Sequence, residues 1–432
     1  MERNSKNYYI YYTRSDTYMK DKLKVGVVGI GRGGMMISYC EKAEHAELVA
    51  ICDKWEEGLN RSKKQHGDKI AYYTSYDEFL KHDMDVVVLA NYANEHAPFA
   101  IKAMKAGKDV ISEVLPVQCL AEAVELVETV EKTGREYCYL ENYCYMPGPR
   151  EMRKLYRDGL IGEIQYAEGE YVHNCEPIWP SITYGERDHW RNNDYSTFYC
   201  THSIGPMVHI TGKRPTKVVA FEHPFSEMHA RMGATGGLFG LEILTLDNGA
   251  IFKSIHGSLY KNSIWYTVYG SKGRMETARE DALQGDISHL YINANKEETD
   301  YSQEGCRFEN YYPSDEFTEK AKEFGHGGSD FYSMYNAIEW IRGNKSADRI
   351  DVYEALDMFL PGLFGYFSIL AGNIPMDIPD LRDRSIRDRY RNDRRCTDPK
   401  VAGDQLLPPN KGGMPDIPDA VYERIRNIWL GK

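Results

Sequence analysis

The sequence predicts an α/β protein in which a doubly wound parallel sheet is followed by an α+β domain with an open-faced, largely antiparallel sheet. Three observations predict this order. A glycine-rich turn follows the first apolar run. Strand and helix patterns then alternate from Lys24 to about Leu140, as in a parallel sheet with crossover helices. After Pro147 the strand patterns follow one another directly, which favours an antiparallel or mixed sheet.

The first expected strand, 24–29, ends in the motif Gly29-x-Gly31-x-x-Gly34, and a helix pattern follows it. In a Rossmann-type turn the first glycine allows the tight turn, the second lets the backbone approach a pyrophosphate, and the third lets the helix pack on the strand. The next apolar run ends in Asp53, close to the offset of about 20 residues expected for an acid that binds ribose hydroxyls. We therefore predict an NAD site, because the Asp53 carboxylate would repel the 2′-phosphate of NADP. A structural turn without a ligand is the alternative.

Further strands of the first sheet are expected at 47–53, 85–90, 109–112 and 136–140, with helices such as 98–106 and 120–132 between them. Ligands of such sheets lie beyond the carboxyl ends of the strands. Polar side chains at these ends are therefore candidates for the cofactor site, and Arg32 in the glycine turn is a candidate phosphate contact. The strand-end candidates are Asn91, His96, Glu113 and Asn142. As alternatives, the two asparagines can cap turns, the histidine can simply begin a helix, and the arginine can face solvent.

The second half is expected to begin with a helix at 149–158 and to continue with five strands and two late helices. The strands are expected at 163–173, 216–222, 238–246, 249–257 and 264–270, and the helices at 329–342 and 352–371. The chain is therefore divided into an extension at 1–22, a Rossmann domain at 23–147, an α+β domain at 148–380 and a tail at 381–432. The tail is rich in Pro, Arg and Asp, so we expect it to be a solvated segment that wraps the surface.

Composition excludes several classes of protein. The net charge of -12 argues against a nucleic-acid-binding surface. No apolar run reaches the ~18 residues of a membrane span, and the first 22 residues contain no apolar core of a signal peptide. The nine cysteines form no C-x-x-C pair, which favours a reducing cytoplasm and gives no indication of zinc. Tyrosine is frequent, at 33 residues, and its flat ring with a polar end suits sugar sites and interfaces as well as ordinary packing.

The order of elements over about 22–380, together with three motifs, resembles the family named after glucose–fructose oxidoreductase, inositol dehydrogenase and MocA. The motifs are the Asn142–Pro147 run, His202 followed by Thr211-Gly212, and Glu113 in place of the Glu of a Glu–Lys–Pro motif. Two departures stand out. Val114 replaces the lysine of that motif, and Phe198 replaces the aspartate that members commonly carry four residues before the histidine. An ordinary sugar dehydrogenase would therefore lack two of its usual groups.

A subgroup fits better. The sequence around Glu141-Asn142, Tyr171-x-His173, Trp190-Arg191, Tyr199-x-x-His202 and His326-Gly-Gly-Ser-Asp is similar to that of the NAD-dependent glycosidases of glycoside hydrolase family 109. This resemblance implies a small carbohydrate or glycoside substrate. It also implies hydride removal from C3 to NAD+, loss of the C2 proton, elimination of the C1 substituent, addition of water and return of the hydride. The implied catalytic residues are Glu141, Tyr171, Tyr199 and His202, and the implied substrate contacts are His173, Trp190, Arg191 and His326.

Alternatives remain for the roles of single residues and for the function of the protein. The histidines and tyrosines can be packed core or hydrogen-bonding groups, Trp190-Arg191 can be a surface feature, and His326 can simply precede a helix. His202, His173 and Glu141 could suggest a metal, but no close spacing supports one, so none is expected. The rival functions are an NAD-dependent sugar or cyclitol dehydrogenase and a non-catalytic NAD-binding sensor. The open sheet face also predicts a homo-oligomer, and neither nucleic acid nor membrane is expected as a partner.

Overall fold

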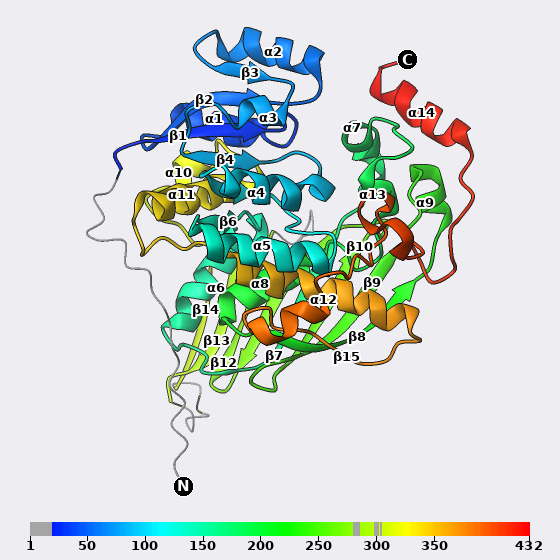
Figure 1. Cartoon of the computed structure of the whole chain (residues 1–432). Coiled ribbons are helices and arrows are strands. Elements are labelled where there is room, and N and C mark those ends of the chain that lie inside the picture. Colours follow the sequence, from blue (N-terminus) through cyan, green and yellow to red (C-terminus); the bar gives the residue numbers. More distant parts are fainter. Residues whose placement is uncertain (1–19, 280–285, 298–301, 303–304) are drawn as a thin grey trace.

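The computed structural model describes residues 20–279, 286–297, 302 and 305–432, so the predicted extension at 1–22 lies almost wholly outside the described residues. Two sheets organise the chain, one in each half (Figure 1). The first has six strands in the order β3-β2-β1-β4-β5-β6, and every pair between neighbours is parallel. The strands are β1 (Leu23–Val28), β2 (Ala46–Cys52), β3 (Ala71–Tyr73), β4 (Val86–Leu89), β5 (Asp109–Ser112) and β6 (Tyr137–Tyr139).

Burial on both faces explains why these strands read as short continuous apolar runs. All four residues of β4 and of β5 are buried, as expected where helices cover both faces of a parallel sheet. The helices of this half are α1 (Gly34–Lys42), α2 (Glu56–His66), α3 (Tyr76–Phe79), α4 (His96–Lys105) and α5 (Leu120–Thr133). Among the six strands of the first sheet, β3 alone was not predicted. Its three residues are half-buried and too few to form a pattern.

The second sheet has nine strands in the order β14-β13-β12-β11-β7-β10-β9-β8-β15. Its pairs are antiparallel except for β7 with β10, so the prediction of a largely antiparallel sheet is confirmed. The five predicted strands are β7 (Ile164–Val172), β8 (Pro215–His223), β9 (Phe239–Leu246), β10 (Ile251–Gly257) and β11 (Ser263–Gly270). Four were missed: β12 (Gly273–Thr277), β13 (Leu290–Asn295), β14 (Cys306–Tyr311) and β15 (Met376–Asp377).

Helices α6 (Pro147–Arg157), α8 (Thr201–Thr211) and α12 (Val352–Leu370) cover one face of this sheet (Figure 1). Every residue of α8 is buried, so this helix is held on all sides between the sheet and its neighbours. Helix α11 (Ser329–Arg342) returns to pack on α1, which joins the two halves. The short helices α7 (Trp179–Thr183), α9 (Glu227–Met232), α10 (Thr318–Ala321) and α13 (Pro399–Ala402) were not predicted.

The tail is less solvated than expected, although it does wrap the molecule. Arg387 is buried and donates to Leu381 O and to both carboxylate oxygens of Glu131 on α5. Further on, the chain forms α14 (Asp419–Trp429), which packs against α7 and α9. Arg387 therefore serves a specific ion pair, whereas most other charged side chains of 382–395 are exposed, as expected for a solvated segment. In the described part of the chain, no helix is long and apolar enough to cross a membrane.

Candidate functional site

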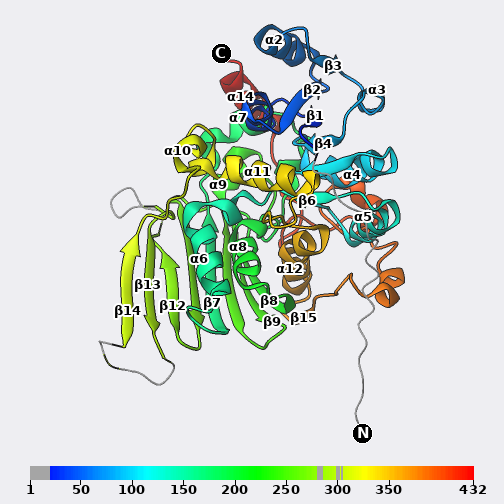
Figure 2. The ribbon, with the colours of Figure 1, turned by 90° about the vertical axis from the view of Figure 1, so that its left-hand side faces the viewer.

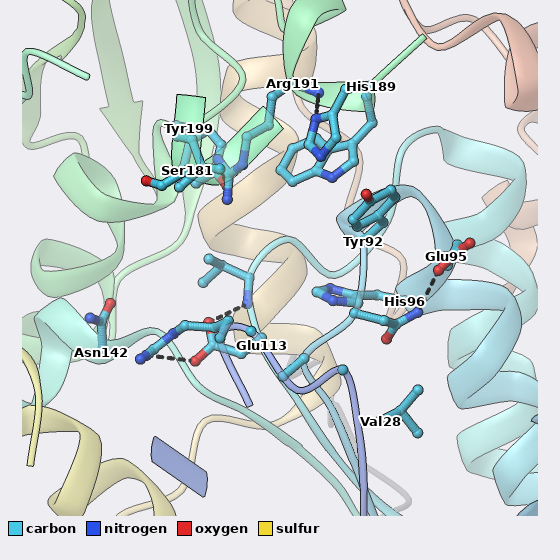
Figure 3. A pocket seen from close by; sticks show the side chains of 18 of the residues that line it. Val28, Tyr92, Glu95, His96, Glu113, Asn142, Ser181, His189, Arg191 and Tyr199 are labelled. Atoms are coloured by element: carbon cyan, nitrogen blue, oxygen red, sulfur yellow. Dashed lines mark hydrogen bonds and ion pairs between the residues drawn. The ribbon is translucent and has the colours of Figure 1, made fainter. Parts of the chain in front are cut away.

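A cavity of about 740 Å³ lies between the carboxyl edge of the first sheet and the loops of the second domain (Figure 3). In the figure, Tyr199, Arg191 and His189 face Asn142, Glu113 and His96 across open space. Residues predicted from distant parts of the sequence therefore meet at one place. Those that line the cavity are Gly29, Gly31, Arg32, Asp53, Asn91, His96, Glu113, Asn142, Tyr171, His173, Trp190, Arg191, Tyr199, His202 and His326. Gly34 and Glu141 do not line it.

The glycine turn has the shape that a pyrophosphate needs. Gly29 has φ +91°, and a Cβ there would lie 2.5 Å from Ala90 O. A Cβ on Gly31 would meet only the Tyr184 hydroxyl, at 3.7 Å, so its surface is open to a ligand. The assignment of Gly34 as the close-packing glycine is wrong: a Cβ there meets nothing within 4 Å, whereas one on Gly33 would overlap Gly29 O. Gly33 is the residue whose lack of a side chain lets α1 approach the strand.

Asp53 ends β2 at the cavity and is held by two backbone amides. Its Oδ2 accepts from Ile30 N at 2.9 Å, and its Oδ1 accepts from Trp55 N at 2.8 Å. The carboxylate therefore fixes the glycine turn while it lines the space where a ribose would lie.

Arg32 is not a free phosphate contact. It donates two hydrogen bonds to Asp330 of α11, at 2.8 and 2.6 Å, and lies 2.7 Å from Glu113 Oε1. Burial acts to raise the pKa of Asp330, but Arg32 and His326 hold it well below its usual range. Burial raises the pKa of Glu113, against the opposing effect of Arg32. His326 reaches the cavity rim and points its Nδ1 at Asp330, 3.0 Å away. This network joins the two halves of the chain.

Two strand-end residues present polar atoms that have no partner in the described structure. Asn91 donates to Glu95 at 2.9 Å, but its Oδ1 is buried without a partner. His96 has Nδ1 3.0 Å from Leu115 O, and its Nε2 is likewise buried and unpartnered. Burial lowers the pKa of His96 to about 4, so the ring is neutral at physiological pH. Buried polar atoms are seldom left unpaired, so these atoms, with the open glycine turn, fit a dinucleotide in the cavity.

His202 and Glu141 form a buried pair at the centre of the second half of the site. His202 Nδ1 lies 2.6 Å from Glu141 Oε1. Glu141 is fully buried behind the ring, where Gly205 of α8 leaves room for its side chain. Glu141, named above as an implied catalytic residue, thus contacts His202 and does not itself line the cavity. With Nδ1–H donated to the carboxylate, Nε2 is the nitrogen that can accept a proton on the cavity side.

Two tyrosines flank this histidine. The Tyr171 hydroxyl, at the end of β7, lies 3.2 Å from Nδ1 of His173, which follows the strand. Tyr199 accepts from Arg191 Nη1 at 2.8 Å. Tyr199 lies in the turn before α8, and its carbonyl accepts from His202 N. Burial raises the pKa of both tyrosines, with Arg191 opposing at Tyr199, so both are neutral phenols that can donate.

Sequence reasoning missed several aromatic residues of the cavity wall. Tyr92 and Tyr143 follow strand ends, whereas Tyr184 and His189 come from the irregular stretch between β7 and α8. Burial lowers the pKa of His189 to about 3, so it is a neutral aromatic wall against Trp190 and Tyr92. The strand-end position could have indicated the first two, but no periodic pattern marks the others. Among the described residues, no group of three His, Cys, Asp or Glu is placed to hold a metal ion.

The parallel sheet, the open glycine turn and the acid after β2 define a dinucleotide-binding protein with an oxidoreductase fold. Residues 23–140 match the model of an oxidoreductase family with an NAD-binding Rossmann fold, and residues 261–386 match the C-terminal domain of glycosyl hydrolase 109. The resemblance seen in the sequence is thus confirmed: one stretch of the chain is similar to the NAD-binding domain of the first family, and a later stretch is similar to the C-terminal domain of the second. Its cofactor is NAD, and it is an oxidoreductase-like protein related to glycosyl hydrolases.

Individual relatives agree with this assignment. A glycosyl hydrolase family 109 protein of Solibacter usitatus is 28% identical over 397 residues, 83% of this chain and 88% of that protein. One of Porphyromonas gingivalis is 26% identical over 84% of this chain and 85% of that protein. A scyllo-inositol dehydrogenase from Lactobacillus casei, solved with bound NAD(H) and scyllo-inositol, has a TM-score of 0.63 at 16% identity and covers 82% of this chain and 99% of that chain. At that identity the likeness shows the fold.

Proposed function

We propose that the protein is an NAD-dependent glycoside hydrolase that acts on a small glycoside by transient oxidation at C3, elimination across C1 and C2, addition of water and re-reduction. The observation that carries the proposal is the His202–Glu141 pair, whose free ring nitrogen shares one cavity with the open glycine turn. The names of the family 109 relatives support the hydrolase outcome.

Bound NAD+ would supply a hydride acceptor and later return the hydride. His202 Nε2 is placed to accept the proton of the sugar hydroxyl that is oxidised, and Glu141 stabilises the imidazolium that forms. After His202 has passed its first proton to water, its Nε2 can take the C2 proton. The Tyr199 phenol, which accepts from Arg191, and the Tyr171 phenol, beside His173, can donate to the leaving oxygen, and the phenol that gives up its proton regains one from the His202 imidazolium. Trp190 is buried beside the Arg191 guanidinium, which lies 4.3 Å from its ring, so the pair forms a rigid wall for the sugar.

Carboxylate geometry argues against ordinary glycoside hydrolysis, which needs two carboxyl groups flanking the scissile bond. Among the described lining residues of the cavity, the carboxylates are Asp53, Glu95 and Glu113. Each lies on the dinucleotide side and is held by a partner: backbone amides, Asn91 and Arg32 respectively. The wall around His202 consists of histidines, tyrosines and Arg191, which suits proton transfer rather than a carboxylate pair.

A sugar or cyclitol dehydrogenase is the second candidate, because solved relatives of this fold include proteins named inositol dehydrogenases. Against it stands Val114, which lines the cavity where ordinary dehydrogenases of the family carry a lysine. A valine cannot share a proton with a substrate hydroxyl. The base role therefore falls on His202 alone.

A panel of aryl glycosides tests the proposal, with aglycone release and NADH absorbance followed together. We expect release without net NADH and solvent deuterium at C2 of the product. Stoichiometric NADH from an intact sugar would instead establish a dehydrogenase. His202→Ala should abolish turnover, with the exposed His223→Ala as the matched control. Nucleotide binding with no substrate turnover in the wild type, and no effect of His202→Ala, would establish a sensor.

We also propose that the open sheet face joins copies of the chain. Phe221, Leu241 and Ile255 form a cross-strand row on the face opposite α8 and α12, and Phe221 is 47% exposed. Such a face suits an isologous interface. Light scattering should show an oligomer that Phe221→Glu dissociates; a wild-type monomer would contradict the proposal.

We also propose that the protein works in the cytoplasm. All nine cysteines are free thiols, as a reducing compartment favours.

A further inference from the structure

The C-terminal helix reaches the dinucleotide end of the cavity. Tyr184, at the end of α7, lines the cavity and places its hydroxyl over Gly31. Its ring lies 5.2 Å from that of Trp429, the last residue of α14. Trp429 in turn lies 6.5 Å from Trp55, which follows the ribose-site residue Asp53 by two positions. Helix α14 lies beside α7 in both views of the ribbon (Figures 1 and 2).

The body of α14 is anchored to the second domain. Ile425 packs in a small apolar cluster with Trp179, Met232 and Ala234. Tyr422 donates its hydroxyl to Gly233 O at 3.0 Å. A Cβ on Gly185 would lie 2.5 Å from Arg426 N and 2.6 Å from Tyr422 O, so only glycine lets the helix approach the α7 turn this closely. The helix is therefore held firmly along its length.

The end of α14 reaches the first domain through the contact between Trp429 and Trp55. Trp429 is 38% exposed and Trp55 is 41% exposed, so the contact between them is at the surface rather than in a core. Trp55 also lies beside the glycine turn, because a Cβ on Gly58 would contact both Trp55 and Ile30. Tyr184 has φ +59°, which is costly for a residue with a side chain, so its position over Gly31 is fixed by the surrounding structure. Three rings from three distant segments thus form one cluster, of which Tyr184 lines the cavity.

We propose that α14 is a strap that retains the bound dinucleotide, with Tyr184, Trp429 and Trp55 as its closing contact. The inference rests on NAD binding but not on the hydrolase reaction. The strap also agrees with the proposed reaction, in which a cofactor that returns its hydride within each cycle does not need to leave. Both family models end at or before residue 386, and the strap therefore lies outside them.

Nucleotide release tests the strap without any substrate. Protein loaded with NAD+ or NADH is mixed with excess competitor, and dissociation is followed by nucleotide fluorescence and by the nucleotide retained after gel filtration. Trp429→Ala should speed dissociation at least tenfold, which corresponds to 1.4 kcal/mol. Trp429→Phe should restore most of the retention. Ile428→Ala is the matched control, because Ile428 precedes Trp429 on the same helix and is 57% exposed.

Trp55→Ala keeps the test valid if Trp429→Ala disturbs the helix, because it removes the same contact from the first domain. It should also speed release at least tenfold, and the double variant should release no faster than either single variant. Equal release rates for wild type, Trp429→Ala and Trp55→Ala would overturn the strap. A wild type that binds no nucleotide would overturn the cofactor assignment as well. Strap variants that behave as expected in a protein without glycosidase activity would overturn only the proposed function.

Discussion

At the scale of single residues, the proposed reaction depends on a carboxylate, that of Glu141, which does not line the cavity. Glu141→Gln keeps the shape of the side chain but removes the charge that stabilises His202 when protonated. We expect kcat to fall roughly 10²–10⁴-fold, the usual contribution of general acid–base catalysis, while the Kd for NAD+ is unchanged. The matched control is Glu242→Gln: burial raises the pKa of Glu242 to about 8, so that group is already neutral at pH 7. Equal kcat values for the two variants would contradict the role of Glu141.

The glycine turn offers a second residue-scale prediction, with a control one position away. Gly33→Ala places a methyl group against Gly29 O, although its backbone at φ -62° suits alanine. We expect it to weaken NAD binding at least tenfold and to lower the melting temperature. The methyl group of Gly34→Ala would lie in open space, so this variant should leave NAD binding and the melting temperature unchanged. Isothermal titration and thermal melts of the two variants measure this, and equal behaviour would restore Gly34 as the close-packing residue.

At the scale of elements, α6, α8 and α12 are joined by a buried charge cluster that makes stability depend on pH. His209 of α8 lies 2.6 Å from Glu354 and 3.2 Å from Asp348, with Arg153 nearby. Burial would lower the pKa of His209, but the two carboxylates raise it above its ordinary value of about 6.5. The stabilisation from this charge is therefore fully present below about pH 6.5 and is lost as pH rises through the raised pKa.

His209→Gln should consequently destabilise the protein most at pH 6, by about 3 kcal/mol, the cost of breaking a buried pair. The difference from wild type should shrink at pH 8 and 9, in urea unfolding at each pH. Exposed His223→Gln serves as the control and should change little. A difference that grows with pH would show that the cluster is not held by a charged histidine.

Elements with a strong pattern could be predicted from the sequence, and those without one could not. The buried runs of β1, β4 and β5 and the apolar helix α12 were found because burial imposes continuous or periodic hydrophobicity. Strand β14 was missed because it lies at the edge of the sheet and none of its residues is buried. Helix α7 is five residues long, too short for a period of 3.6 to show. Edge position thus explains why β14 was missed and short length explains α7, whereas neither applies to β12 and β13 inside the sheet.

At the scale of the whole molecule, strand-end position predicted the residues on one side of the cavity, and family resemblance predicted those on the other side. Neither could show that Glu141 stands behind His202, or that Arg32 faces Asp330. Such contacts join residues 61 and 298 positions apart and depend on how the two domains meet. The role of the tail was missed for the same reason: its charges look solvated until Glu131 of α5 is placed against Arg387.

Arg32 gives the prediction that concerns the molecule as a whole. It links the glycine turn to Asp330 of α11 and to Glu113 after β5, so its removal leaves a buried carboxylate without a cation. Arg32→Gln should lower the free energy of unfolding by about 3–5 kcal/mol and split a single calorimetric transition into two, as the domains lose their shared ion pair.

The contribution of Asp330 to stability depends on pH with the opposite sign to that of His209. The pKa of Asp330 is depressed in the folded protein, so its stabilisation is present above its unfolded pKa of about 3.9 and is lost as pH falls further. Arg32→Gln should therefore lose less stability than wild type between pH 5 and pH 3. Adding Asp330→Asn to Arg32→Gln should recover much of the stability at pH 7, because the uncompensated charge is gone. If the double variant were no more stable than Arg32→Gln, the ion pair would not be what couples the two domains.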